Sequence, residues 1–135
     1  MVYKILILLF LLPLNSHALI ATEEQFIAKT IEARAIESNL SPVQMVSIAV
    51  CESSLKMTAK NVNRNKSTDY GVFQINEIHF QTMRKAGLSP FNYVDNINYA
   101  LFLIQVDGLR HFSASRKCWS SPKTIAKVKL LLAQT

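Results

Sequence analysis

Glycine and proline are scarce in this sequence, with three and four residues respectively in a chain of 135. Their scarcity excludes collagen-like chains and long flexible linkers. Half of the residues are apolar and only 18% are charged, so the composition is not that of a disordered chain. The length allows one domain plus a targeting segment and excludes two catalytic domains.

Long hydrophobic runs are also absent. The longest, residues 5–14, is broken by Pro13 and is too short to cross a bilayer of about 30 Å as a helix. Lys4 precedes the run, and Ser16-His17-Ala18 places small residues at positions −3 and −1 of a cleavage site. This three-part pattern predicts a signal peptide over residues 1–18, with an uncleaved anchor as the alternative.

The chain after residue 18 contains no stretch that predicts a membrane span, because the apolar segment 99–106 is too short. We therefore expect an exported protein, periplasmic or extracellular, without a stable span after cleavage. Removal of Lys4 lowers the formal charge from +6 to +5. A basic exported protein suits an anionic partner such as a cell wall or a membrane surface. Zinc-finger spacings, basic-region helices and repeats are absent, so no nucleic-acid partner is expected.

Cysteine is limited to Cys51 and Cys118. In an oxidising compartment these two can pair, and the closed loop would contribute about 4 kcal/mol through the entropy of the unfolded chain. Two separate buried thiols are the alternative. His79 and His111 show no metal-ligand spacing, so we expect no metal and no cofactor, and we expect His79 on a helix surface.

Helical patterns dominate residues 19–135, which we interpret as one α+β, mostly α, domain. Capping boxes at Thr22–Gln25 and Ser41–Gln44 predict helices ending near residues 38 and 54. Further helices are expected over 77–86, over 96–107 with Asp95 as the cap, and from Ser121 onward. The first helix is expected to bury an apolar stripe, namely Phe26, Ile27, Thr30, Ala33 and Ile36. The turn-rich segment 56–76 predicts a small β-hairpin, with residues 70–75 extended.

Glu52 is unusual because it falls in the last turn of an otherwise apolar helix. Burial and the negative helix terminus both favour the protonated form, so we expect its pKa to be raised. A protonated carboxylic acid in a cleft can protonate a glycosidic oxygen as the bond breaks. The alternative is a glutamate that points to solvent.

The sequence that follows Glu52-Ser53 is a more specific indication of function than Glu52 alone. Residues 67–76 read Ser-Thr-Asp-Tyr-Gly-Val-Phe-Gln-Ile-Asn. Together with the helix that ends in Glu-Ser, this segment resembles the lysozyme-like superfamily, above all the bacterial soluble lytic transglycosylase domains and the animal-type lysozymes. The resemblance covers about residues 41–119. It implies a lysozyme-like fold with a small β-hairpin beside a helical core.

The resemblance also implies roles. Glu52 matches the acid that protonates the glycosidic oxygen and then, in the transglycosylases, takes the proton of the sugar's 6-hydroxyl to give a 1,6-anhydromuramyl product. Gln74 and Asn76 match residues that hydrogen-bond the saccharide, and Tyr70 with Gly71 matches the bend beside the glutamate. Three further residues are candidates for contact with the active site or the substrate, and two of them have a structural alternative. Ser53 would bond near Glu52 or pack at the helix end, Tyr99 would stack on a sugar, and Trp119 would stack likewise or cover the disulfide.

Asp69 has two interpretations. It lies 17 residues after Glu52, in a setting that resembles that of the second carboxylate of animal-type lysozymes. A retaining hydrolase needs its two carboxyls about 5 Å apart. Alternatively, Asp69 bonds backbone amides and shapes the turn. Two departures bear on this choice: animal-type lysozymes use several disulfides, and the Ala-Tyr-Asn-x-Gly motif of longer transglycosylases is replaced by residues 109–113.

We therefore expect a peptidoglycan-cleaving muramidase that cuts the MurNAc–GlcNAc β-1,4 bond, more by lytic transglycosylation than by hydrolysis with Glu52 and Asp69. A non-catalytic wall-binding module is the third alternative. The expected partners are peptidoglycan glycan strands, with a secretion, conjugation or phage-entry apparatus as the system that the enzyme would serve.

Overall fold

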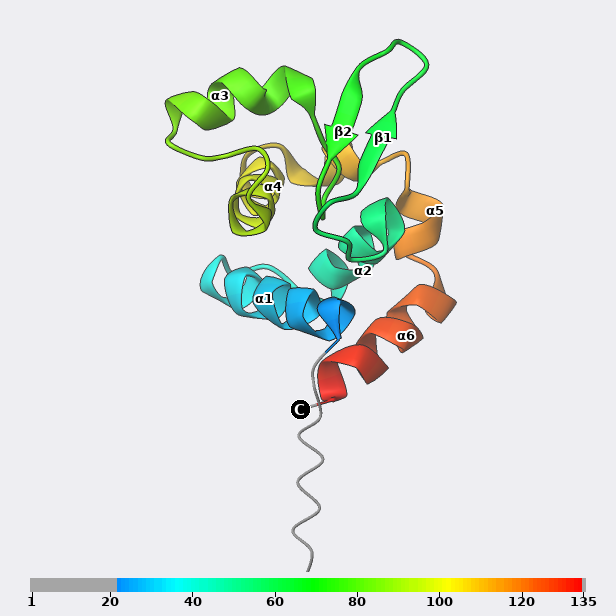
Figure 1. The fold of residues 1–135 in the computed structure, drawn as a ribbon. Helices are drawn as coiled ribbons and strands as arrows, with labels where there is room; N and C mark the ends of the chain where they lie inside the picture. The colour runs from blue at the N-terminus through cyan, green and yellow to red at the C-terminus, as the bar shows by residue number, and fades with distance from the viewer. Residues whose placement is uncertain (1–21, 135) are drawn as a thin grey trace, which may run out of the picture.

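The computed structural model describes residues 22–134, arranged as helices around a small sheet (Figure 1). The predicted signal peptide, residues 1–18, lies outside the described residues. The α-helices are α1 (Glu23–Glu37), α2 (Pro42–Ser53), α3 (Phe80–Lys85), α4 (Tyr93–Asp107), α5 (Arg116–Trp119) and α6 (Pro122–Ala133). Two 3₁₀ helices, η1 (Glu77–His79) and η2 (Gly108–Phe112), and three strands, β1 (Lys60–Val62), β2 (Thr68–Tyr70) and β3 (Ile75–Asn76), complete the fold. The α+β, mostly α class is confirmed.

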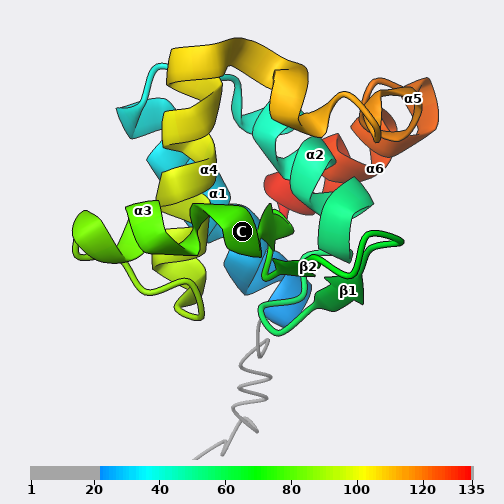
Figure 2. The same ribbon diagram turned by 90° about the horizontal axis from the view of Figure 1, so that it is seen from above.

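Helix α2 is the central element, as its lack of charge predicts. Five successive residues, Met45–Ala49, are buried on all sides because α2 packs against α1, α5 and α6. Figure 2 shows these helices gathered around it. Ser41 caps its start by accepting a hydrogen bond from the Gln44 amide. Its end is set by Ser54 and Leu55, which both adopt positive φ. The side chain of Glu52 therefore emerges where the helix stops.

The expected buried stripe of α1 is wrong in phase. The buried residues are Ile27, Ala28, Ile31 and Ala35, whereas Phe26, Ala33 and Ile36 are exposed. The two alanines lie on the inner face, where α1 packs against α2, α4 and α6. Small side chains there allow close approach of the helices, so the larger Phe26 is left at the surface, where its ring packs on Tyr93. The predicted capping box at Thr22 and Gln25 is confirmed.

The predicted hairpin is confirmed and gains a third strand. The sheet is antiparallel in the order β1-β2-β3, with Asn61 opposite Asp69 and Asp69 opposite Asn76. Residues 70–75 are not one extended segment, since residues 71–74 form a turn. The cause is burial: Val72 and Phe73 are fully buried in the core, so the chain turns inward between β2 and β3.

The later helices differ from expectation mainly at their starts. Asn92, not Asp95, caps α4, because its Oδ1 accepts hydrogen bonds from the amides of residues 94 and 95. The Asp95 carboxylate instead accepts a bond from the Ser89 amide. The segment 77–86 divides into η1 and α3, and the elements η2 and α5 were not predicted. The α4 stripe of residues 97, 100, 101 and 104 is buried, as expected.

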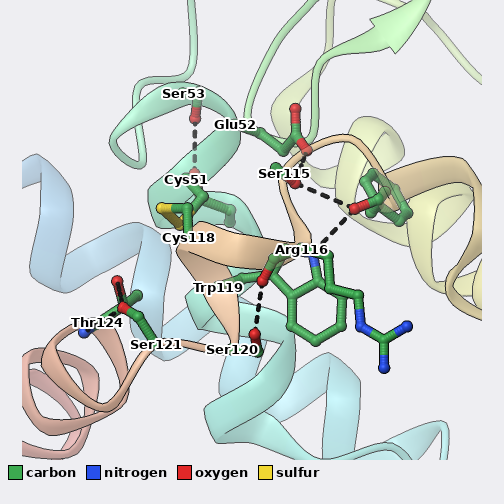
Figure 3. Close-up of a disulfide and its surroundings, with 12 residues drawn as sticks. Cys51, Glu52, Ser53, Ser115, Arg116, Cys118, Trp119, Ser120, Ser121 and Thr124 are labelled. Carbon is green, nitrogen blue, oxygen red and sulfur yellow. Dashed lines mark hydrogen bonds between the residues drawn. A yellow bond between two sulfur atoms is a disulfide. The ribbon is translucent and has the colours of Figure 1, made fainter.

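A disulfide between Cys51 and Cys118 joins the last turn of α2 to α5, which confirms the pairing. Figure 3 shows it beside Glu52. Within residues 22–134, every helix is too short or too polar to cross a bilayer. The disulfide is consistent with an exported protein.

Candidate active-site cleft

A cleft opens between the sheet and the chain that joins η2 to α5. It is lined by residues from four regions: Glu52, Asp69, Phe73, Gln74, Ile75, Asn76, His79, Leu103, His111, Phe112 and Ala114. Four of the residues proposed from the sequence, namely Glu52, Asp69, Gln74 and Asn76, therefore lie together in one cleft. Charged, amide and apolar side chains alternate along its walls, which suits a ligand with both polar groups and apolar faces.

Glu52 is the half-buried acid of this cleft. Ser115 donates a hydrogen bond of 2.6 Å from Oγ to the Glu52 carboxylate (Figure 3). Burial raises the pKa of Glu52, the Ser115 bond lowers it, and the negative charge of Asp69 raises it again. The net direction is upward, as the sequence predicts. Glu52 is thus suited to hold a proton at a pH where an ordinary glutamate has lost it.

Ser115 is a residue that sequence reasoning missed, because it lies 63 positions from Glu52 in an unpredicted segment. The disulfide could have located it. Cys118 pairs with Cys51, the neighbour of Glu52, and Ser115 lies one helical turn before Cys118.

The Asp69 carboxylate is held from two sides. Asn76 donates from Nδ2 to Oδ1 at 2.6 Å, and Asn63 donates from Nδ2 to Oδ2 at 2.9 Å. The sheet register produces the first contact, because Asn76 pairs directly with Asp69 across β2 and β3. Asn76 also donates to Ser67 Oγ. Its amide therefore positions Asp69, in addition to lining the cleft.

The turn 71–74 carries Gln74 into the cleft in a backbone conformation that side chains rarely adopt. Gln74 has φ +49°, and its Nε2 donates to the carbonyls of Ala59 and Gly71, which hold the turn in place. Below the turn, the buried Asn96 of α4 accepts a bond from the Phe73 amide and donates one to the Tyr70 carbonyl. A Cβ atom on Gly71 would lie 2.7 Å from Asn96 Nδ2, so only glycine fits there.

Three residues proposed to bind substrate lie outside the cleft lining. Ser53 Oγ donates to the Val72 carbonyl at 2.7 Å, which ties α2 to the turn. Tyr70 packs its ring against Phe80 and Phe91, on the other side of the turn. Tyr99 is only 4% exposed, so its ring cannot stack on a sugar. These positions correct the direct binding roles that we expected.

Trp119 is likewise buried, and its indole Nε1 donates to the Phe112 carbonyl rather than facing the cleft. Phe112 is a core residue that packs edge-on against Phe73 at the cleft wall.

A pair of histidines forms part of the cleft wall, and His79 is half-exposed on η1, in keeping with the expected helix surface. His79 Nδ1 lies 3.1 Å from the Tyr99 hydroxyl, and its ring meets that of His111 edge-to-face at 5.7 Å. His111 Nε2 lies 2.8 Å from Asp107 Oδ2. Burial, then the nearby His111, lowers the pKa of His79, whereas the hydrogen bond from His111 lowers the pKa of Asp107. Tyr99 therefore acts beneath the cleft, as a partner of His79.

Metal ligation is not indicated in the described part of the chain, where no three His, Cys, Asp or Glu residues are grouped closely enough to hold an ion. Glu52, whose raised pKa favours the protonated form, lines the same cleft as the amide-held Asp69 carboxylate, together with amide and imidazole groups. This combination is suited to acid-catalysed cleavage of a bond to oxygen.

Comparison with known proteins finds partial similarity to two kinds of protein. Over 51 residues, 38% of this chain, the sequence is 41% identical to Protein IpgF of Shigella flexneri, and the match covers 34% of that protein. Over 49 residues, 36% of this chain, it is 49% identical to Lysozyme C of Penaeus merguiensis, covering 31% of that protein. The match thus spans about a third of each relative. No protein-family model matches the chain.

Proposed function

We propose that this protein cleaves the MurNAc–GlcNAc β-1,4 bond of peptidoglycan, with Glu52 as the general acid. The observation that carries the proposal is a half-buried carboxyl with a raised pKa, set in a cleft beside a second carboxylate. Such an acid keeps its proton to a higher pH than an ordinary glutamate and can protonate the leaving oxygen. The partial similarity to a lysozyme supports the same class of reaction.

The favoured route is lytic transglycosylation. Glu52 gives its proton to the glycosidic oxygen as the C1–O4 bond breaks, and the resulting carboxylate then accepts the proton of the sugar's own 6-hydroxyl as O6 attacks C1. One carboxyl serves both steps, and no water is consumed. This route needs only Glu52 as a titrating carboxyl, and the two amide hydrogen bonds to the Asp69 oxygens are compatible with either route.

Hydrolysis is the second candidate, and one observation favours it. Asp69 lines the same cleft as Glu52 and its charge acts on the Glu52 pKa. In this route Asp69 stabilises or bonds the sugar C1 after Glu52 has protonated the leaving oxygen, and water completes the reaction. The two candidates differ in product: the transglycosylase leaves 1,6-anhydromuramyl ends, and the hydrolase leaves reducing ends.

Digestion of purified peptidoglycan followed by mass spectrometry tests the proposal. We expect anhydromuramyl ends from the wild type and a loss of at least about 100-fold in rate for Glu52→Gln, with wall binding retained. Glu77→Gln, an exposed carboxylate in η1, is the matched control and should cleave normally. Cleavage by Glu52→Gln at the wild-type rate would refute the assigned acid.

Asp69→Asn separates the two candidates. A fold-preserving loss as complete as that of Glu52→Gln, with reducing ends from the wild type, would favour hydrolysis. A wild-type protein that binds peptidoglycan without cleaving it would instead be a wall-binding module. Export to the periplasm or the cell exterior, and local opening of the wall for a secretion, conjugation or phage-entry apparatus, belong to the same proposal and rest on the predicted signal peptide and the expected substrate.

A further inference from the structure

The net positive charge of this protein arises in its C-terminal part. Residues 108–135 contain six Lys and Arg residues and no Asp or Glu, which equals the formal net charge of the whole chain, +6. The first 107 residues therefore carry balanced charge. In the structure all six basic side chains are exposed, on η2, α5 and α6: Arg110, Arg116, Lys117, Lys123, Lys127 and Lys129.

Helix α6 has an unusual outer face. Its inner side packs against α2 and α1 through the fully buried Val128. The opposite side carries Ala126, Leu130 and Ala133, spaced i, i+4 and i+7, and all three are exposed. Leu130 is 69% exposed. The three positions form one continuous apolar strip along the side of α6 that faces away from the core.

Lysines flank the strip on both edges. At 100° per residue, Lys123 and Lys127 lie on one side of Leu130 and Lys129 lies on the other. An apolar line bordered by lysines is the pattern of a helix that lies in the plane of a membrane surface, because the apolar line enters the headgroup boundary while the lysines reach anionic lipid phosphates. Residues 108–135 themselves contain no acidic side chain that such a surface would repel.

The position of α6 in the fold agrees with this arrangement. Gln25 Nε2 in the first turn of α1 donates to Gln134 Oε1 just after α6, at 2.7 Å, so the two ends lie side by side (Figure 1). Lys29 Nζ also donates to the Leu132 carbonyl. The C-terminal end of α6 is therefore held against the N-terminal half of α1.

We propose that the outer face of α6, composed of Lys123, Lys127, Lys129 and Leu130, docks on an anionic lipid bilayer. The occupant is the phosphate-bearing surface of the bilayer, with Leu130 at the headgroup boundary. The catalytic cleft is lined by none of these residues, so docking leaves it open. The proposal does not depend on the proposed cleavage reaction.

Vesicle sedimentation of residues 19–135, the chain without the predicted signal peptide, tests the proposal. The readout is the ratio of partition coefficients on phosphatidylglycerol-containing and pure phosphatidylcholine vesicles. The triple variant Lys123→Gln, Lys127→Gln, Lys129→Gln should lower this ratio about 100-fold, on the basis of about fivefold per lysine. Leu130→Gln should lower partition onto the anionic vesicles about tenfold.

The matched control removes three exposed lysines elsewhere, Lys56→Gln, Lys66→Gln and Lys85→Gln, for the same change in net charge. It should keep most of the wild-type ratio, and raising the salt from about 0.1 M to about 1 M should abolish the preference. Equal losses in the two triple variants would overturn the proposal, because net charge alone would then explain binding. No preference of the wild type for anionic vesicles, or binding to wall polyanions and not to vesicles, would overturn it as well. Peptidoglycan cleavage, measured in parallel, reports separately on Glu52.

Discussion

Three interactions act on the Glu52 carboxyl in opposite directions. Burial and the charge of Asp69 favour the neutral acid, whereas the Ser115 hydroxyl stabilises the carboxylate by hydrogen bonding. A general acid needs the first two effects to keep its proton and benefits from the third when the proton leaves. Ser115, which is not among the residues that line the cleft, is thus a positioning residue that tunes the pKa of Glu52.

The pH dependence of cleavage should show these effects. Because Glu52 must be protonated, the rate falls as pH rises through its raised pKa. Ser115→Ala removes the bond that lowers this pKa, so the alkaline limb of the pH–rate profile moves to higher pH. Initial rates on purified peptidoglycan across the pH range provide the measurement.

Ser113→Ala, an exposed serine in the same loop, is the control and should leave the profile unchanged. A carbon-13 NMR titration of the Glu52 carboxyl checks the shift without reference to activity. Movement of either midpoint to lower pH in Ser115→Ala would contradict the assigned role.

Only some of the functional residues in the cleft could be predicted from the sequence. The raised pKa of Glu52 follows from its place in an apolar helix, and Asp69, Gln74 and Asn76 follow from one continuous motif. The histidine wall could not be predicted in the same way. His79 and His111 meet because η1 and η2, two short 3₁₀ segments without a periodic pattern, bring the two rings into contact at the cleft.

At the scale of elements, the cleft depends on how the turn 71–74 is attached to α4. The buried Asn96 side chain bonds the backbone on both sides of Gly71, at Phe73 and Tyr70. The helix pattern of α4 was readable in the sequence, but the function of its one buried polar residue was not, since the partner atoms are backbone groups 23 and 26 positions away. The start of α4 was misplaced for a similar reason, because Asn92 and Asp95 are both capable caps.

Asn96→Ala should therefore lower both the stability of the fold and the activity of the folded protein. It leaves a buried N–H and a buried C=O without a partner, so we expect the free energy of unfolding to fall by about 3 kcal/mol. Gln74 and Asn76 lose their support, and the cleavage rate should fall at temperatures where the variant is still folded. Urea unfolding and initial rates measure the two effects.

Asn92→Ala is the matched control on the same helix. It removes the N-cap, costs about 1 kcal/mol, and should leave the rate of the folded enzyme intact. Equal losses of rate in the two variants, once both are shown to be folded, would show that Asn96 serves the stability of α4 alone.

At the scale of the whole molecule, the structure separates two kinds of surface. The cleft lies between the sheet and the chain before α5, and the basic face lies on α6 beside the start of α1. The surplus of positive charge in residues 108–135 could be counted from the sequence. The apolar strip between the lysines could not be identified until the structure showed, through the buried Val128, which side of α6 faces the core. The central position of α2 was predictable because a helix without charge has no side suited to water.

Because Glu52 is the one acidic residue of this central helix, its ionisation in the folded state should lower the stability of the protein. Because the folded state raises the pKa of Glu52 above its value in the unfolded chain, the folded protein binds this proton more tightly, and stability decreases as pH rises from the unfolded pKa through the folded one. Below that window Glu52 is protonated in both states and adds no penalty; above it the penalty is complete.

Glu52→Gln should consequently be more stable than the wild type at pH above the window and equal to it at acidic pH. Relief of a destabilised active-site residue is commonly worth about 1 kcal/mol. Urea unfolding at both pH values measures the difference, with the exposed Glu77→Gln as a control that should change little at either. A variant that is less stable than the wild type at neutral pH would mean that the hydrogen bond from Ser115 outweighs burial and the charge of Asp69. A gain in stability together with the loss of cleavage would identify Glu52 as an acid kept in place at the expense of the fold.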